Sequence, residues 1–261
     1  MSFAKTCHVR GTLRVVKGSR SETPSSGVIG TGGGPGHAGY GLASSARVLT
    51  QRGLVPAGEL QGGDTVSDGL GGWAPVAAAL HVTTDLGADR VLIAQGALGG
   101  GLPRCDLELG LSVRLRMRSD LAARLVGGEA VLISAAHLVG LPGITRVSGF
   151  TRDITHVLFD RYGCCLAEDL VVEGFVPEVA RLESLPEHHK ERVHATLPKL
   201  RYTGALASYE AQLPEINARE ARQILAEPVD FGAEAGKVAV PPKTMGRDPA
   251  PRLPHPGAGA T

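Results

Sequence analysis

Between residues 46 and 175 the chain alternates short apolar runs with turn-forming residues, and this alternation limits the folds open to it. Segments rich in glycine and aspartate separate the runs and supply the positive φ angles that tight turns need. The run 112–117 alternates apolar and polar residues: Val113, Leu115 and Met117 on one face of a strand, and Ser112, Arg114 and Arg116 on the other. The pattern predicts an all-β domain, sandwich-like or barrel-like, with strands at 47–50, 65–66, 74–84, 90–94, 106–109, 112–117, 129–134 and 154–159.

Composition narrows the classes of partner. The 27 basic and 26 acidic residues nearly cancel, which argues against nucleic acid and a charged membrane surface as partners. No run approaches the roughly 18 apolar residues of a membrane-spanning helix. The first residues lack the apolar stretch of a secretion signal, so we expect a chain that is cytoplasmic or exported without a classical signal peptide.

Four segments differ in character along the chain. Residues 1–40 are rich in Gly, Ser and Pro and are predicted to be flexible, whereas residues 41–177 form the β domain. Helix formers dominate residues 178–227, which predicts a short α-helical extension, with Asn217 capping a helix from Ala218 to about Ala226. Residues 228–261 form a Pro/Gly-rich tail that we expect to be disordered.

Cysteine and histidine spacing predicts no metal site, and the glycine run 32–34 lacks the residues of a phosphate loop, so no cofactor is expected. The histidines at 188, 189 and 194 lie in a polar stretch with no apolar frame around them. We expect Cys7, Cys105, Cys164 and Cys165 to be buried, reduced thiols that fill small core sites.

The stretch 46–76 resembles the opening of a bacterial Hint (Hedgehog/intein) domain. Its strand, turn glycine and Gly-Asp step are matched, in order, by Thr50, Gly53, Leu60, Gly63, Asp64 and Val66. The stretch 90–117 resembles the part of the family that leads to its central catalytic strand. The family's last third is matched by His137-Leu138-Val139, Phe159-Asp160-Arg161, Ala167-Glu168-Asp169 and Gly174-Phe175-Val176-Pro177.

The resemblance implies that the family's reaction is self-cleavage and that this chain lacks the residues for it. Hint domains cut their own backbone through an acyl shift, in which a Cys or Ser at the first residue attacks the preceding carbonyl and a central histidine protonates the leaving nitrogen. The corresponding positions here are Gly41 and Val113, and the later family histidine is replaced by Tyr162. We therefore expect a catalytically degenerate domain that acts as a structural or interaction module.

Two alternatives remain open on the sequence. If the match shifts by three or four residues, Ser44 or Ser45 is the nucleophile of an N-to-O acyl shift, assisted by His137 or His156. Asp160 would orient His156 only through a bulge, because four residues of regular strand span about 13 Å. Alternatively, the domain binds a protein or peptide partner, not identified by the sequence, by strand addition at an open sheet edge.

Overall fold

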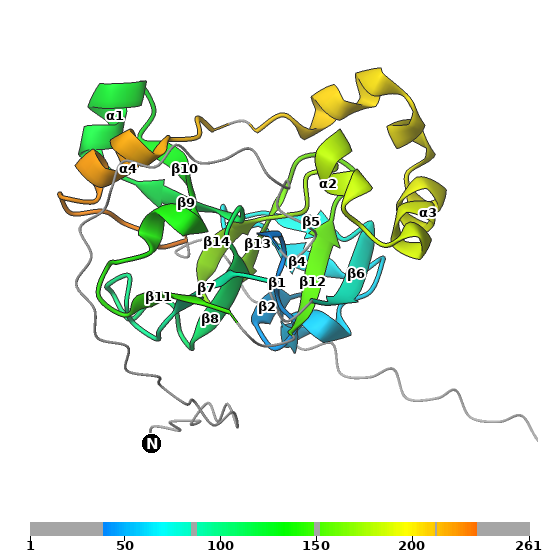
Figure 1. Cartoon of the computed structure of the whole chain (residues 1–261), viewed down its shortest axis with the longest axis horizontal. Coiled ribbons are helices and arrows are strands. Elements are labelled where there is room, and N and C mark those ends of the chain that lie inside the picture. The colour runs from blue at the N-terminus through cyan, green and yellow to red at the C-terminus, as the bar shows by residue number, and fades with distance from the viewer. Residues whose placement is uncertain (1–38, 85–87, 149–151, 212, 234–261) are drawn as a thin grey trace, which may run out of the picture.

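The computed structural model describes residues 39–84, 88–148, 152–211 and 213–233, and it confirms a mostly β fold with a few helices. Strands occupy the centre of the molecule, with α1 and α4 at one end and α2 and α3 at the other (Figure 1). The predicted segments 1–40 and 228–261 lie largely outside the described residues, as does Cys7.

Antiparallel pairing builds two sheets. The six-stranded sheet has the order β11 (Ile144–Val147), β7 (Arg90–Ile93), β8 (Leu107–Gly110), β1 (Leu42–Ala43), β12 (Asp153–Leu158) and β6 (Ala78–Thr83). The eight-stranded sheet has the order β10 (Ala130–Ser134), β9 (Arg114–Arg118), β14 (Leu170–Glu173), β13 (Cys164–Ala167), β2 (Arg47–Thr50), β4 (Thr65–Ser67) and β5 (Trp73–Pro75), with β3 (Gly53–Pro56) also paired to β2.

Helical segments are short and lie around the strands. The α-helices are α1 (Asp120–Val126), α2 (Val179–Glu183), α3 (Glu187–Thr196) and α4 (Ala218–Ile224). The 3-10 turns are η2 (Ala57–Glu59), η3 (Ala135–Leu138), η4 (Pro198–Arg201) and η5 (Thr203–Tyr209). Asn217 caps α4 through a capping box with Glu220, as its position in the sequence predicts. No helix among the described residues is long and apolar enough to cross a membrane.

The alternation predicted for 112–117 holds from Arg114 onward, but both faces of β9 are covered. Leu115 and Met117 are buried in the main core. Arg114, on the other face, is also buried because it forms ion pairs with Glu173 on β14 and Glu215 in the C-terminal extension. On the polar face of this strand, Arg114 therefore contacts carboxylates and is shielded from solvent.

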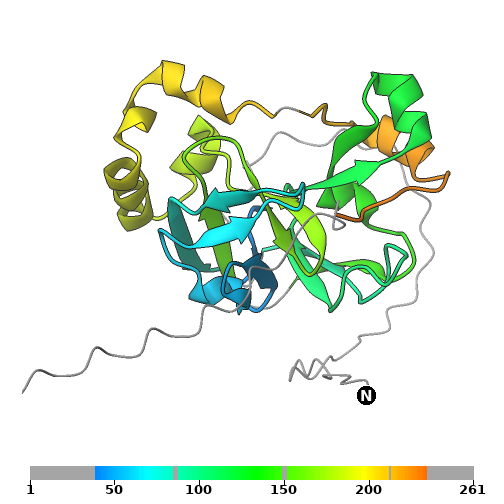
Figure 2. The same ribbon diagram turned by 180° about the vertical axis from the view of Figure 1, so that it is seen from behind.

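The C-terminal extension packs on the β domain and has no core of its own. Leu80, Leu158 and Phe175 of the β domain are covered by apolar residues that follow α2 in the chain. These covering residues are Leu185, Val193, Leu197, Leu200 and Tyr209. The chain then crosses along one side of the molecule from α3 to α4 (Figure 2). It joins the edge of β10, where the Leu132 N–H donates to Pro214 O and the Ile216 N–H donates to Leu132 O.

Residues 228–233, which the sequence assigns to the tail, are placed against the sheet. Asp230 and Arg118 exchange two backbone hydrogen bonds, Gly232 bridges Leu170, and Phe231 is only 2% exposed. One apolar aromatic residue within a Pro/Gly-rich stretch is enough to anchor it, because burying a phenylalanine side chain contributes about 1.5–3 kcal/mol.

The cysteines divide into two kinds. Cys164 and Cys165 on β13 are free and buried, as expected. Cys105 is disulfide-bonded, so the expectation of a reduced thiol is wrong there. Unlike the other two, Cys105 lies partly buried in the turn before β8, outside the core.

Candidate functional site

Gly41, Val113 and His156 line one small cavity where β1, β12 and the start of β9 meet. Glu173, Phe175 and Arg181 close other sides of it. The cavity volume is about 10 Å³, which is room for one water molecule at most. The positions that the resemblance assigns to the nucleophile and the acid therefore do lie together in space.

The backbone at Gly41 leaves no space for a side chain. Gly41 has a φ of +77°, a conformation that residues with a Cβ rarely adopt. A Cβ built there would lie 2.8 Å from His156 Nδ1 and 2.9 Å from the carbonyl oxygen of Thr155. A cysteine or serine at this position would require β12 to move.

Val113 lies in the turn before β9 and not within the strand. Its N–H donates to Gly110 O at 3.1 Å, and its own carbonyl accepts from Ala135 N at 2.8 Å. Ser112 also lines this cavity. Strand alternation does not apply there, because β9 begins only at Arg114.

His156 is the imidazole of this cavity. It is fully buried on β12, opposite Leu80 of β6, and its ring centroid lies 5.0 Å from that of Phe175. The imidazole occupies the space next to Gly41 where a nucleophile's side chain would have to stand. His156 therefore packs against Gly41 and Phe175.

Arg90 donates hydrogen bonds to the carbonyl oxygens on both sides of Gly41 N, and the sequence analysis did not single it out. The side chain is 1% exposed, and it donates to Gly41 O at 3.0 Å and to Tyr40 O at 3.4 Å. Glu108 pairs with it at 3.1 Å. Burial lowers the pKa of Arg90 to about 10, and the charge and hydrogen bond of Glu108 oppose that shift, so the guanidinium stays charged at neutral pH. An arginine opening the apolar run 90–94 was the available signal.

Backbone hydrogen bonds hold the same segment from the other side. Gly110 N donates to Gly41 O at 2.9 Å, and Ser112 N donates to Gly39 O at 2.9 Å. Gly39 and Tyr40, which the sequence places in the flexible segment, are thus tied to β8 and the turn after it. The two peptides on either side of the Tyr40–Gly41 bond are therefore both held by backbone hydrogen bonds.

Ser44 meets a different histidine from the two expected. Its hydroxyl lies 2.9 Å from Thr155 Oγ1, which lies 3.1 Å from His81 Nδ1, and His81 Nε2 lies 3.2 Å from Leu60 O. A carbonyl only accepts, so Nε2 carries a proton, and in the tautomer with that single proton Nδ1 accepts from the Thr155 hydroxyl. The Ser44 hydroxyl then donates to Thr155. Ser45, by contrast, is exposed.

The remaining candidates lie apart from the cavity. His137 is partly buried in η3, outside the residues that line the cavity around Gly41. Asp160 lies beyond the end of β12, is exposed and faces Arg161 at 3.8 Å. The structure therefore brings neither residue to His156. The described residues contain no group of three or more His, Cys, Asp or Glu side chains placed to hold a metal ion.

A model of the Hint domain family matches residues 40–179, more than half of the chain. The chain belongs to the Hint domain family. The match begins one residue before Gly41, at the junction described above. Among solved structures, the crystal structure of the gp41-1 intein matches with a TM-score of 0.31 and 10% sequence identity, covering 52% of this chain and 98% of that one. No curated protein matches the chain.

Proposed function

We propose that this Hint domain has lost the self-cleavage reaction at the Tyr40–Gly41 bond and serves as a structural or interaction module. One observation carries the proposal: the space that a nucleophilic side chain would need at Gly41 is taken by His156 Nδ1 and the Thr155 carbonyl. Without a hydroxyl or thiol at this position no ester can form.

Two further features support the loss. The Val113 side chain has no proton to give to a leaving amine, and that step is what general acid catalysis supplies. The cavity of about 10 Å³ leaves little room for the tetrahedral intermediate of an acyl transfer. The ancestral positions are thus filled by packing groups, consistent with a role that needs the fold and not the reaction.

The test is the intact mass of the full-length chain after incubation at neutral pH, with and without a thiol or hydroxylamine. An acyl shift produces a thioester or an ester; a thiol cleaves the thioester, and hydroxylamine cleaves both. We expect a single species of 27.0 kDa under all conditions. A fragment that ends at Tyr40 would contradict the proposal.

A second candidate function is self-processing at the Ala43–Ser44 bond, and the hydrogen-bonded chain from Ser44 through Thr155 to His81 favours it. The Ala43 carbonyl oxygen already accepts from Ala46 N at 2.9 Å, which would polarise it for attack. Ser44 Oγ would bond to the Ala43 carbonyl carbon, the C–N bond would break, and the hydroxyl proton would end on the Ser44 nitrogen.

This candidate has its own control pair. Hydroxylamine should release fragments 1–43 and 44–261 from the parent chain, and the Ser44→Ala variant should not be cut. Ser45→Ala, which removes the exposed neighbouring hydroxyl, should be cut like the parent. An uncut parent chain removes the candidate.

A further inference from the structure

A second and larger cavity opens beside the chain's single tryptophan, and it shares no lining residue with the cavity around Gly41. This Trp73 pocket has a volume of about 300 Å³, and its apolar lining consists of Leu70, Trp73, Ala74, Pro75, Phe159 and Tyr162. Leu70 is 42% exposed, which places it at the surface of the molecule. The proposed function gives this pocket no role.

The charged groups of the lining do not select a charged ligand. Asp160 and Arg161 both line the pocket, and their side chains face each other at 3.8 Å. Asp68 Oδ1 accepts two backbone hydrogen bonds within its own turn. Lys199 Nζ donates to the Asp160 carbonyl oxygen and adds a positive charge nearby. The ligand is therefore selected by the apolar and aromatic part of the lining.

The last described residue of the chain lies on the surface that leads to this pocket. Ala233 packs against the small apolar cluster of Cys164, Leu166 and Val171, and Tyr162 packs against the same cluster. Tyr162 and Cys164 also line the pocket. One apolar surface on β13 and β14 therefore connects Ala233 to the pocket wall, and the chain beyond Ala233 begins there.

The sequence that follows contains a segment whose chemistry fits an aromatic pocket. Residues 238–242 read Val-Ala-Val-Pro-Pro and carry no charge, and a lysine flanks them on each side. Adjacent prolines favour the extended polyproline II conformation. Proline-rich segments dock in grooves lined by aromatic side chains, because this conformation exists before binding and little entropy is lost. The rings of Trp73 and Tyr162 offer such a lining.

The connection between Ala233 and this segment is short. Residues 234–237 separate them, so Val238 can lie up to about 17 Å from Ala233 when the connection is extended. Because a single side-chain cluster links Ala233 to the pocket wall, this reach is sufficient. A short connection gives an effective concentration in the millimolar range, so an intrinsic dissociation constant of about 1 mM would keep the segment docked about half of the time or more.

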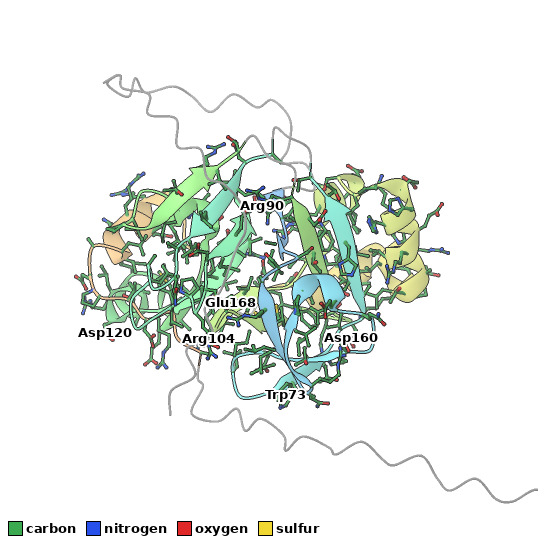
Figure 3. All side chains as sticks on the ribbon, turned by 90° about the horizontal axis from the view of Figure 1, so that it is seen from below. Trp73, Arg90, Arg104, Asp120, Asp160 and Glu168 are labelled. Carbon is green, nitrogen blue, oxygen red and sulfur yellow. The ribbon has the colours of Figure 1, made fainter. Side chains whose placement is uncertain are left out.

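We propose that residues 238–242 of this chain dock in the Trp73 pocket, with Pro241 and Pro242 against the rings of Trp73 and Tyr162. This rests on the interaction-module role and deepens it, because it names the docking surface and the segment that occupies it. Figure 3 shows Trp73 and Asp160 on one side of the molecule, with Asp120 on α1 far from both.

The first test is acrylamide quenching of tryptophan emission in the full-length chain, in which Trp73 is the only tryptophan. The double variant Pro241→Gly, Pro242→Gly loses the preformed conformation and should expose Trp73, which would raise the quenching constant at least about twofold. The matched control, Pro254→Gly with Pro256→Gly, makes the same change later in the chain and should leave quenching unchanged. Equal quenching in the parent and the first variant, or an equal rise in both variants, would overturn the proposal.

The second test changes the pocket and leaves the segment intact. Trypsin cuts after Lys237 and Lys243, and docking should slow both cuts. Leu70→Ala removes part of the pocket lining and should speed them at least about threefold, because proteolysis follows the population of the undocked form. Leu125→Ala on α1, where the side chain is 47% exposed, should not change them. The cut after Arg252 serves as the internal reference, and an unchanged ratio in Leu70→Ala would contradict docking in this pocket.

These results are separable from the proposed loss of cleavage. Intact mass tests the Tyr40–Gly41 bond, and neither quenching nor trypsin reports on that bond. An undocked segment would remove this inference and leave the loss of cleavage standing, whereas a fragment ending at Tyr40 would remove the loss of cleavage whatever the segment does.

Discussion

At Gly41 the backbone turns through a positive φ and passes directly against β12. Substitution at this residue has two costs that can be separated: the left-handed conformation, and the overlap with His156 and Thr155. A side chain at this position therefore meets two separate obstacles, the backbone conformation and the contact with β12.

We expect Gly41→Ala to lower the free energy of unfolding by about 2–4 kcal/mol, which combines the left-handed backbone with overpacking. The matched control is Gly127→Ala at the end of α1, where φ is also +77° but no atom lies within 4 Å of the new Cβ. That control should lose about 1 kcal/mol. Urea unfolding of both variants gives the comparison, and equal losses would show that the overlap at Gly41 is relieved without cost.

The sequence reached some of these residues and not others, for a physical reason. Gly41 and Val113 were assigned to the nucleophile and histidine positions through a family pattern, because such a pattern depends only on the order of residues along the chain. Thr155 and His81 were missed because their link to Ser44 depends on the pairing of β12 with β6 and β1, across 111 and 74 positions. A long-range pair of this kind leaves no local pattern. His137 and Asp160 were candidates because they are titratable residues within the family pattern, and the fold places them away from the cavity.

At the scale of elements, α3 is docked through a histidine on its buried side. His189 Nε2 donates to the carbonyl of His81 on β6 at 3.0 Å. Burial, and then the neighbouring His188, lower the pKa of His189 below its ordinary 6.5. The folded protein therefore holds this ring neutral, whereas the unfolded chain takes up a proton at about pH 6.5.

It follows that stability from α3 docking is present above about pH 6.5 and falls as the pH drops toward the lowered pKa of His189. We expect amide hydrogen exchange in α3 to accelerate over this range relative to exchange in β9. His189→Gln is the matched variant, because its side-chain amide still donates but does not titrate. The same acceleration in this variant would assign the pH dependence to another group.

The segment after α4 adds backbone pairing and one aromatic anchor to the edge of the β domain. Phe231→Ala should cost about 3–5 kcal/mol of unfolding free energy, the usual loss for a buried aromatic side chain. Tyr202→Ala provides the control, because Tyr202 is 74% exposed and its removal should change stability by less than about 0.5 kcal/mol. Thermal unfolding distinguishes the two, and a similar small effect in both would mean that residues 228–233 do not contribute to the fold.

At the scale of the molecule, the family match and the packed structure do not end at the same place. The match stops at residue 179, but apolar residues as far as Phe231 belong to the described cores. Sequence patterning predicted the β domain well, because alternation and turn glycines are local signals. It could not predict that the polar, short helices beyond it close the surface around Phe175 and the edge of β10, because that depends on the assembled sheets.

A chain ending at Pro177 should therefore lose cooperative unfolding or aggregate, since Leu80, Leu158 and Phe175 would be exposed. The comparison chain ends at Ala233 and keeps every residue of the described cores. Size-exclusion chromatography and the thermal midpoint of the two chains give the answer. A monomeric chain ending at Pro177, with the midpoint of the longer one, would show that the extension is not part of the folding unit.

The central claim, that the ancestral junction is silent, is tested most directly by intact-mass spectrometry of the full-length chain after incubation with hydroxylamine at neutral pH. The account predicts that the Tyr40–Gly41 bond stays whole and that no fragment ends at Tyr40. A fragment with that end, growing with time and absent after heat denaturation, would contradict it and make this Hint domain an active one.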